Sequence, residues 1–218
     1  MGTVIAVTSG KGGTGKTSIT GGVAASLALM GHRVLCIDMD IGLRNLDITL
    51  GLSDRALMDF SDVALGRCPL ARGAVDHPDV KGLSLLTAPM SLSPSLTIDK
   101  VRAMLDTARG QYDYILIDSP AGLGAGFRLA ICGADRALVI ATNDASSLRD
   151  AQRTVCELES IRQVHLIMNR IQPKLLRKLR ATIDDAMNTA GLPLIGVVPE
   201  DDQVMLAANL GQPLTAQG

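Results

Sequence analysis

Aromatic side chains are nearly missing from this chain. Its 218 residues include no tryptophan, two tyrosines and two phenylalanines, so aromatics make up only 2% of the sequence. Proteins that bind single-stranded nucleic acid without sequence preference stack the bases on aromatic side chains, and that class of function is therefore not expected. Because 47% of the residues are hydrophobic, we expect a sizeable core built from aliphatic side chains.

A strong net charge is missing as well. Lysine and arginine total 21 against 22 acidic residues, which gives a net charge of −1. Nothing in this balance favours a nucleic-acid partner, and DNA is not an expected ligand. No apolar run approaches the ~20 residues that span a bilayer. We expect no signal peptide either, because a ligand-binding motif begins at residue 10.

Paired cysteines and metal-ligand spacings are also lacking. Cys36, Cys68, Cys132 and Cys156 form no C-x-x-C pair, which favours a reduced, cytosolic compartment. Cys36 lies within an apolar run, where a buried, inert thiol is expected. The histidines, at positions 32, 77 and 165, have no metal-ligand spacing and are expected to be structural or surface residues.

The chain does contain a phosphate-binding loop. Residues 10–17 read Gly-Lys-Gly-Gly-Thr-Gly-Lys-Thr after the apolar run 4–7, which is the pattern G-x-x-x-x-G-K-[ST] following a strand. Glycines allow the backbone N–H groups to surround a phosphate, Lys16 should reach the β- and γ-phosphates, and Thr17 should hold Mg²⁺. The residues expected to bind ATP here are Gly10, Lys11, Gly12, Gly13, Thr14, Gly15, Lys16, Thr17 and Ser18.

Carboxylates follow two apolar runs farther along the chain. Asp38 and Asp40 close the run 33–37, and Asp118 closes the run 114–117. Ligands in open α/β sheets bind beyond the carboxyl ends of the strands, so we expect these acids near the triphosphate. Asp118 is typical of a carboxylate that helps to hold magnesium through water, and Asp38 is expected to assist it.

The loop with its extra leading lysine, Lys11, resembles the deviant Walker A motif of the MinD/ParA ATPases. The stretches 40–47 and 119–122 resemble the switch segments of the MinD members in particular, and further similarity covers 146–150, 198–201 and 209–213. The stretch 123–126 departs from the pattern, because many relatives carry an acidic residue there. The resemblance spans nearly the whole chain.

This resemblance implies roles for individual residues. Lys11 would reach the nucleotide of a second subunit, and Asp150 would lie near that dimer interface. Asp40 would orient or deprotonate the attacking water, Asn45 would help to position it, and Asp118 would sense the γ-phosphate. The residues implied to contact or line the adenine site are Asn169, Arg170, Pro199, Glu200 and Asp201.

The resemblance also implies a cellular function. The protein would be a slow ATPase that dimerises with ATP and Mg²⁺, acts in septum placement, and lies in the cytoplasm and reversibly at the inner face of the cell membrane. A MinC-like division inhibitor and a MinE- or DivIVA-like activator would be its partners. One alternative is a ParA-like or flagellar-placement ATPase that positions DNA or another cargo. Another is a synthetase that uses ATP to activate a small carboxylate, although no substrate pocket is evident.

The apolar runs and helical patterns alternate, which predicts one α/β domain over 1–218 with the P-loop NTPase fold: a mostly parallel sheet covered by helices on both faces, in three layers. Strands are expected near 3–8, 33–38, 83–87, 112–117, 136–141, 163–168 and 194–198. Helices are expected at 16–30, 98–109, 145–161 and 174–190. Residues 44–80 should contain only short helical pieces.

Two features near the C-terminus leave alternatives open. The helix expected from 174 begins with four cations, Lys174, Arg177, Lys178 and Arg180. A solvated surface helix is favoured for it over a lipid or DNA contact. The last residues, 214–218, cannot form the amphipathic membrane anchor with which MinD proteins usually end. Either the sequence is truncated, which we favour because the matches continue almost to its end, or the protein works without its own anchor.

Overall fold

One sheet runs through the whole molecule in the computed structural model, which describes residues 1–53, 55–179 and 182–210. Within these residues the sheet has eight strands in the order β3-β4-β2-β5-β1-β6-β7-β8. All neighbouring strands are parallel except β3 and β4. The strands are β1 (Thr3–Thr8), β2 (Val34–Asp38), β3 (Val75–Asp76), β4 (Leu83–Leu86), β5 (Tyr114–Asp118), β6 (Arg136–Ala141), β7 (Gln163–Ile171) and β8 (Leu194–Pro199).

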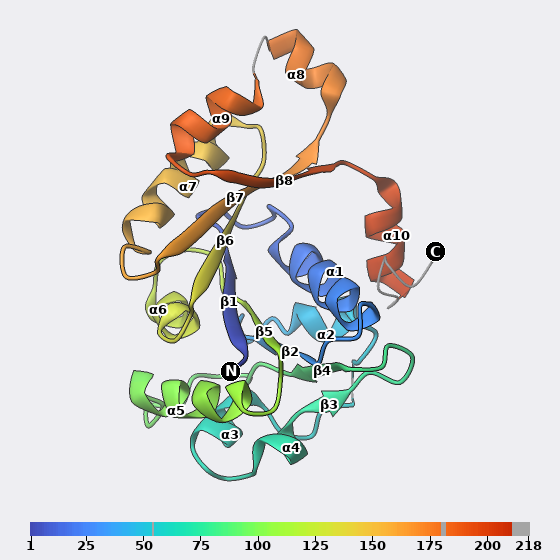
Figure 1. Ribbon diagram of the computed structural model, residues 1–218, viewed down its shortest axis with the longest axis vertical. Helices are drawn as coiled ribbons and strands as arrows, with labels where there is room; N and C mark the ends of the chain where they lie inside the picture. Colours follow the sequence, from blue (N-terminus) through green and yellow to red (C-terminus); the bar gives the residue numbers. More distant parts are fainter. Residues whose placement is uncertain (54, 180–181, 211–218) are drawn as a thin grey trace.

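Helices cover both faces of this sheet, as predicted, and produce three layers (Figure 1). One face carries α1, α2 and α10, and the other carries α3 to α7 and α9. The helices are α1 (Lys16–Leu29), α2 (Asn45–Thr49), α3 (Phe60–Ala64), α4 (Leu70–Gly73), α5 (Ile98–Arg109), α6 (Ala125–Ile131), α7 (Ala145–Cys156), α8 (Pro173–Leu179), α9 (Ile183–Ala190) and α10 (Asp202–Leu210).

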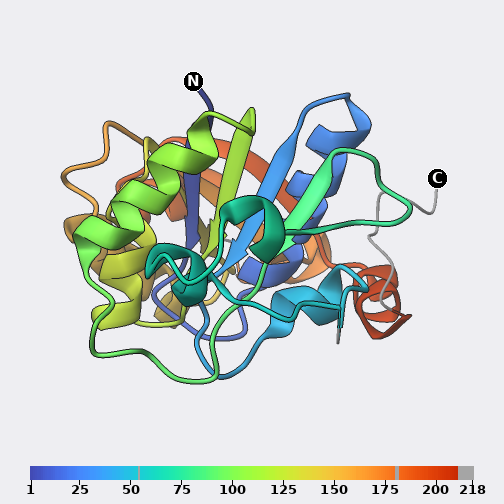
Figure 2. The same ribbon diagram turned by 90° about the horizontal axis from the view of Figure 1, so that it is seen from below.

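The central strands are apolar on both faces because helices bury both. In β1, Val4 packs with the cluster under α5, whereas Ile5 and Val7 pack with the cluster under α1. The short helices α3 and α4 pack against α5 at one end of the molecule (Figure 2). Both phenylalanines, Phe60 and Phe127, are fully buried. The remaining core is aliphatic, as the composition predicts.

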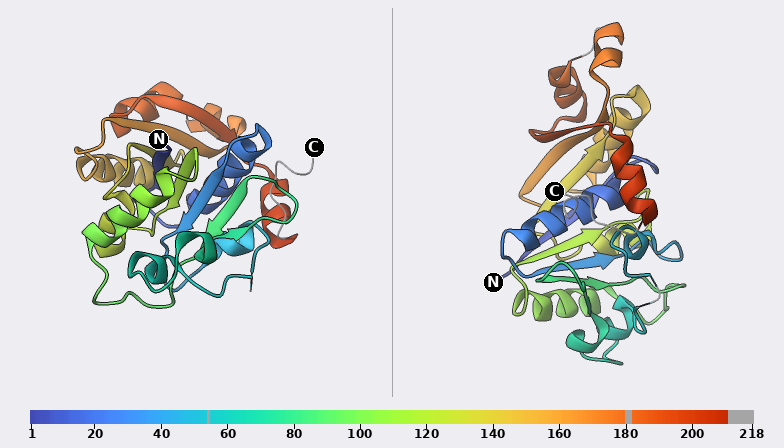
Figure 3. Two further views of the ribbon diagram at one scale, coloured as in Figure 1. Left: turned by 60° about the horizontal axis from the view of Figure 1, so that its bottom comes forward. Right: turned by 90° about the vertical axis from the view of Figure 1, so that its right-hand side faces the viewer.

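The prediction of one helix over 174–190 was wrong. Two helices, α8 and α9, lie in this range, and α8 projects past the end of β7 (Figures 1 and 3). The second helix begins at a capping box, in which Thr182 and Asp185 satisfy each other's backbone N–H groups. A Thr-x-x-Asp pattern marks a helix start, and that signal had been overlooked. Lys174 and Lys178 are exposed, whereas Arg180 and the ending 211–218 lie outside the described residues.

Four further elements differ from the prediction. Strand β3 (Val75–Asp76) lies in the range 44–80, where only short helical pieces were expected, and it pairs antiparallel with β4. The helix expected over 145–161 ends at Cys156. Two helices were not predicted, α6 and α10. The glycines of α6 disfavour a helix locally. Helix α10 starts next to Asp201, whose Oδ1 accepts a hydrogen bond from the Gln203 N–H at 2.8 Å. In α6, a Cβ on Gly126 would lie 3.0 Å from Pro120. Close packing against Pro120 therefore explains this glycine.

One histidine is structural, as expected. His77 is 8% exposed, and its Nδ1 accepts hydrogen bonds from the backbone N–H groups of Asp79 and Val80, each at 3.1 Å. Burial lowers the pKa of His77 below its ordinary value of 6.5. A nitrogen that accepts a hydrogen bond carries no proton, so the folded state holds the neutral ring.

This histidine should make stability depend on pH. The unfolded chain binds a proton near pH 6.5 and the folded chain only at lower pH, so the stabilisation is complete above pH 6.5 and is lost as the pH falls. We expect His77→Asn, whose Oδ1 can accept the same bonds without titrating, to lose less stability than the wild type when the pH falls below 6.5. Urea unfolding of both proteins at about pH 7.5 and pH 5.5 measures this. An equal loss of unfolding free energy between about pH 7.5 and pH 5.5 in the two proteins would contradict the prediction.

Over the described residues, the structure contains no helix that is both long enough and apolar enough to cross a bilayer.

Candidate nucleotide-binding site

The phosphate loop lies between the end of β1 and the start of α1. Gly13 and Gly15 have φ of 77° and 90°, values that strain any residue with a Cβ. Lys16, the first residue of α1, is 8% exposed, and its Nζ donates to Ser9 Oγ at 3.1 Å. Burial lowers the pKa of Lys16, while Asp118 and Asp40 act in the opposite direction. A buried cation thus lies within the loop, as the motif predicts.

The front of the loop packs against α7. A Cβ on Gly10 would lie 2.3 Å from the backbone oxygen of Asp150, so only glycine permits this contact. Asp150 therefore lies beside the loop, and its Oδ1 is 3.7 Å from Arg153 Nη1. Its part in a dimer interface stays a prediction.

Lys11 points away from the phosphate side of its own loop. Its Nζ donates to Asp144 Oδ1 at 3.2 Å and to Ser146 Oγ at 2.8 Å, both at the start of α7. Its side chain is 45% exposed. Three hydroxyl and backbone donors also contact Asp144, and hydrogen bonding lowers the pKa of its carboxyl. No sequence pattern indicated Asp144 and Ser146 as partners of Lys11, because both lie more than 130 positions away.

Two buried carboxylates lie on adjacent strands, and one of them, Asp118, acts on Lys16. Asp38 of β2 is in register with Asp118 of β5. Thr17 Oγ1 donates to Asp118 Oδ2 at 2.7 Å. Burial raises the pKa of Asp38 to about 6 and that of Asp118 to about 7. Asp118 therefore meets the phosphate loop through Thr17, and Asp38 lies next to Asp118 on the neighbouring strand.

Asp38 also holds the segment that follows it. Its Oδ1 accepts the N–H of Asp40 at 2.8 Å, and its Oδ2 accepts the N–H of Leu46 at 3.2 Å. These bonds fix both ends of the turn that carries Asp40 and Asn45. Burial raises the pKa of Asp40, and the nearby Lys16 opposes that shift.

Arg44, in the same turn, is directed elsewhere. Its φ of 50° is in the left-handed region. Its Nε donates to Thr87 Oγ1 at 3.1 Å and is 3.5 Å from Asp47 Oδ2. Its guanidinium is thus engaged outside the phosphate loop.

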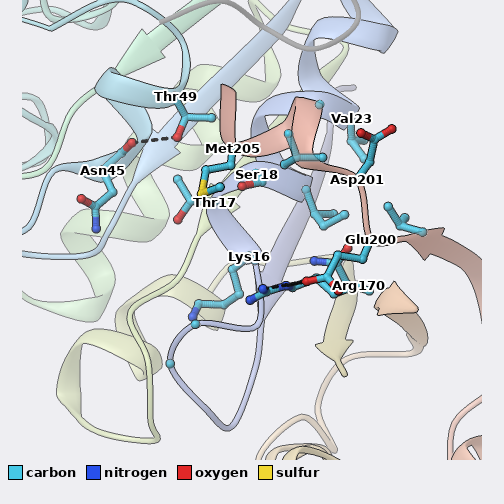
Figure 4. A pocket seen from close by; sticks show the side chains of 18 of the residues that line it. Lys16, Thr17, Ser18, Val23, Asn45, Thr49, Arg170, Glu200, Asp201 and Met205 are labelled. Atoms are coloured by element: carbon cyan, nitrogen blue, oxygen red, sulfur yellow. Dashed lines mark hydrogen bonds and ion pairs between the residues drawn. The ribbon is translucent and has the colours of Figure 1, made fainter. Parts of the chain in front are cut away.

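A cavity of about 950 Å³ joins these parts to the predicted adenine residues. In Figure 4, Lys16 and Thr17 lie between Asn45 on one side and Arg170 and Glu200 on the other. The predicted residues that line this cavity are Gly12, Gly13, Gly15, Lys16, Thr17, Ser18, Asp40, Asn45, Asn169, Arg170, Pro199, Glu200 and Asp201. Gly10, Lys11, Thr14, Asp38 and Asp118 are not among its lining residues.

One wall of the cavity was missed in the sequence analysis. It is formed by the outer side of α1, including Val23 and Leu27, and by Val204 and Met205 of α10. The helix over 16–30 was predicted without any role for its apolar residues in the site, and α10 was not predicted. Residues of α1 and α10 line one cavity although they lie far apart in the sequence, and no local pattern indicates that.

The residues present suit a magnesium–nucleoside triphosphate. The glycine-rich backbone and buried Lys16 provide donors for phosphate, and the cavity has the volume of a small-molecule site. Hydroxyl and carboxylate oxygens, the ligands that Mg²⁺ prefers, meet at Thr17 and Asp118. Asp38 and Asp118 are both buried, and a cation beside them would offset the cost of burying their negative charge.

Comparison with known proteins agrees with this geometry. Residues 5–214 match the family described as the CobQ/CobB/MinD/ParA nucleotide binding domain. A Helicobacter pylori protein described as septum site-determining protein MinD is 41% identical over 98% of this chain and 84% of its own length.

Solved structures show the same relationship. The MinC:MinD cell division protein complex from Aquifex aeolicus contains a chain that is 38% identical, with a TM-score of 0.90 over 98% of this chain and 88% of that one. The Pyrococcus horikoshii septum site-determining protein MinD, complexed with Mg-ADP, is 27% identical, with a TM-score of 0.86 over 99% and 88% of the two chains. This chain therefore belongs to the MinD/ParA family of nucleotide-binding ATPases, within its MinD branch.

Proposed function

We propose that this protein is an ATP-driven switch of the MinD type, acting as a single domain over 1–218, whose active form is a dimer with nucleotide at its interface. The position of Lys11 carries the proposal. Lys16 already supplies a buried cation to its own loop, whereas the half-exposed Lys11 is directed outward, onto Asp144 and Ser146. A lysine on the outer side of the loop would meet a phosphate carried by a second subunit, which supports the proposed dimer.

The chain's own residues would divide the hydrolysis reaction among them. The loop amides and Lys16 would hold the phosphates, and Thr17 with Asp118, assisted by Asp38, would hold magnesium. When bound, magnesium neutralises charge on the phosphate oxygens. Asp40 would orient or deprotonate the attacking water and Asn45 would position it. Phosphoryl transfer depends mainly on such positioning, which suits the fixed turn between Asp38 and Leu46.

In the cell, this switch would take part in septum placement. Its ATP-bound dimer would recruit a MinC-like division inhibitor, and a MinE- or DivIVA-like partner would stimulate hydrolysis. The similarity to the MinD chain of the Aquifex aeolicus MinC:MinD complex supports the first of these partners. The protein would be cytoplasmic and reversibly bound at the inner face of the membrane.

Replacing Lys11 with alanine should abolish dimerisation while leaving ATP binding by the monomer in place. Removing one member of a desolvated charge pair weakens association by about 30-fold or more. Light scattering should therefore give a dimer mass for the wild type with Mg²⁺ and a non-hydrolysable ATP analogue, and a monomer mass for Lys11→Ala.

Two controls make this test specific. ADP in place of the analogue should leave the wild type monomeric, and Lys81→Ala, which removes an exposed lysine outside the site, should dimerise normally. A wild type that stays monomeric, or a Lys11→Ala protein that dimerises like the wild type, would refute the proposal. ATP-dependent retention on DNA that weakens steeply with salt would instead support the cargo-positioning alternative.

A further inference from the structure

Asn169 is bound to the phosphate loop rather than standing free in the cavity. Its side chain comes from β7, is 6% exposed, and donates from Nδ2 to the backbone oxygen of Thr14 at 2.8 Å. This bond joins residues 155 positions apart. The strand beside the adenine side of the cavity is thus tied directly to the loop that binds phosphate.

The bond fixes the orientation of the Asn169 amide. A backbone oxygen can only accept a hydrogen bond, so the NH₂ end must face Thr14 and Oδ1 must face the other way. An acceptor in that position suits the exocyclic amine of adenine. A single side chain would therefore contact the base at one end and the phosphate loop at the other.

The same bond also orients a donor of the loop. The Thr14–Gly15 peptide is trans, as are all peptides in the described chain. The N–H and C=O of a planar trans peptide point in opposite directions. Holding the Thr14 oxygen toward Asn169 therefore turns the Gly15 N–H away from Asn169. Only glycine fits at position 15, because a Cβ there would lie 2.3 Å from Asn169 Nδ2.

The backbone around Asn169 departs from regular strand geometry. Its neighbour Arg170 has φ of 56°, and the pairing of β7 with β8 is irregular between Met168 and Ile171. Arg170 Nη2 is 2.9 Å from Glu200 Oε1, and Gln172 also donates to Glu200. These contacts join the C-terminal ends of β7 and β8 beside the irregular stretch that contains Asn169.

We propose that Asn169 is a positioning residue for the phosphate loop, and that it couples the base site to the phosphate site. The inference rests on the proposed binding of phosphate by residues 10–17. It goes beyond contact with adenine, because it assigns Asn169 an effect on ligands that have no base. Inorganic tripolyphosphate is such a ligand.

Binding of Mg²⁺-tripolyphosphate and Mg²⁺-ATP, measured by calorimetry, tests this inference. We expect Asn169→Ala to weaken both ligands by about 10-fold, the effect of one lost hydrogen bond. Asn169→Asp should weaken both ligands as well. The aspartate has the same size and keeps an acceptor toward the base, but its carboxylate has no N–H to donate to the Thr14 oxygen. The control Asp201→Ser keeps an oxygen able to cap α10, and it should weaken ATP but change tripolyphosphate affinity less than about two-fold.

Hydrogen exchange provides a second readout that does not depend on activity. In both Asn169 variants without nucleotide, amides of residues 12–17 should exchange faster than in the wild type, while those of β1 and β5 stay protected and show that the chain is folded. Unchanged tripolyphosphate affinity in folded Asn169→Ala and Asn169→Asp would overturn the inference alone. A wild type that binds neither ligand would overturn the proposed function itself.

Discussion

An Asp40→Ala protein should bind ATP nearly as well as the wild type and hydrolyse it about 10²- to 10⁴-fold more slowly, the range expected when a general base is lost. Asp40 lines the cavity near Lys16. Its backbone N–H donates to Asp38 Oδ1 at 2.8 Å, and this bond fixes the backbone from which the Asp40 carboxyl extends. Burial raises its pKa, which makes the carboxylate a better proton acceptor than an exposed one.

Single-turnover hydrolysis and equilibrium ATP binding, measured on the same preparations, separate these effects. Asp40→Asn should be as slow as Asp40→Ala, because it keeps the shape but cannot take a proton. Asp106→Ala removes a carboxylate whose side chain is 73% exposed, and it should hydrolyse ATP at the normal rate. Normal turnover by Asp40→Ala would show that water is positioned by another group.

The second large effect is expected for Lys16→Ala, which should lose productive ATP binding, with an affinity about 100-fold or more below that of the wild type. Lys16 is the buried cation beside Asp118 and Asp40. Without it, carboxylates of the site face the triphosphate with no buried positive charge between them. Repulsion between these carboxylates and the triphosphate, together with phosphate oxygens left without a partner, then weakens ATP binding.

Titration with a fluorescent ATP analogue measures this loss. Lys11→Ala is the informative comparison, because it removes a lysine from the same loop but should leave monomeric ATP binding in place. Lys81→Ala, outside the site, should match the wild type. Similar ATP affinities for Lys16→Ala and the wild type would contradict the assignment of Lys16 to the phosphates.

Much of the fold could be read from the sequence, because its signals are local. A buried parallel strand needs an apolar run, and the phosphate loop needs glycines and Lys16 at fixed spacing. Strand β1 and helix α5 have the predicted bounds. The acids Asp38 and Asp118 were placed correctly, since the carboxyl ends of parallel strands share one edge of the sheet.

Other parts of the fold were not predicted. Helix α6 has glycines that disfavour a helix, and its packing against Pro120 outweighs that preference. Helix α10 follows an aspartate cap and contacts α2 from far along the chain. The range 174–190 read as one amphipathic helix because its apolar spacing is continuous, although a cap at Thr182 starts a new one.

The sequence by itself determined the three-layer fold with its aliphatic core and the phosphate loop, and it predicted which residues would surround a nucleotide. Only the tertiary structure decided how two of those residues are used. Lys11 donates hydrogen bonds to Asp144 and Ser146, more than 130 positions away. Asn169 donates one to the Thr14 backbone oxygen. The physical reason is that spacing along a strand or helix specifies which face a side chain occupies, whereas its hydrogen-bond partner depends on which distant segment the folded sheet brings beside it.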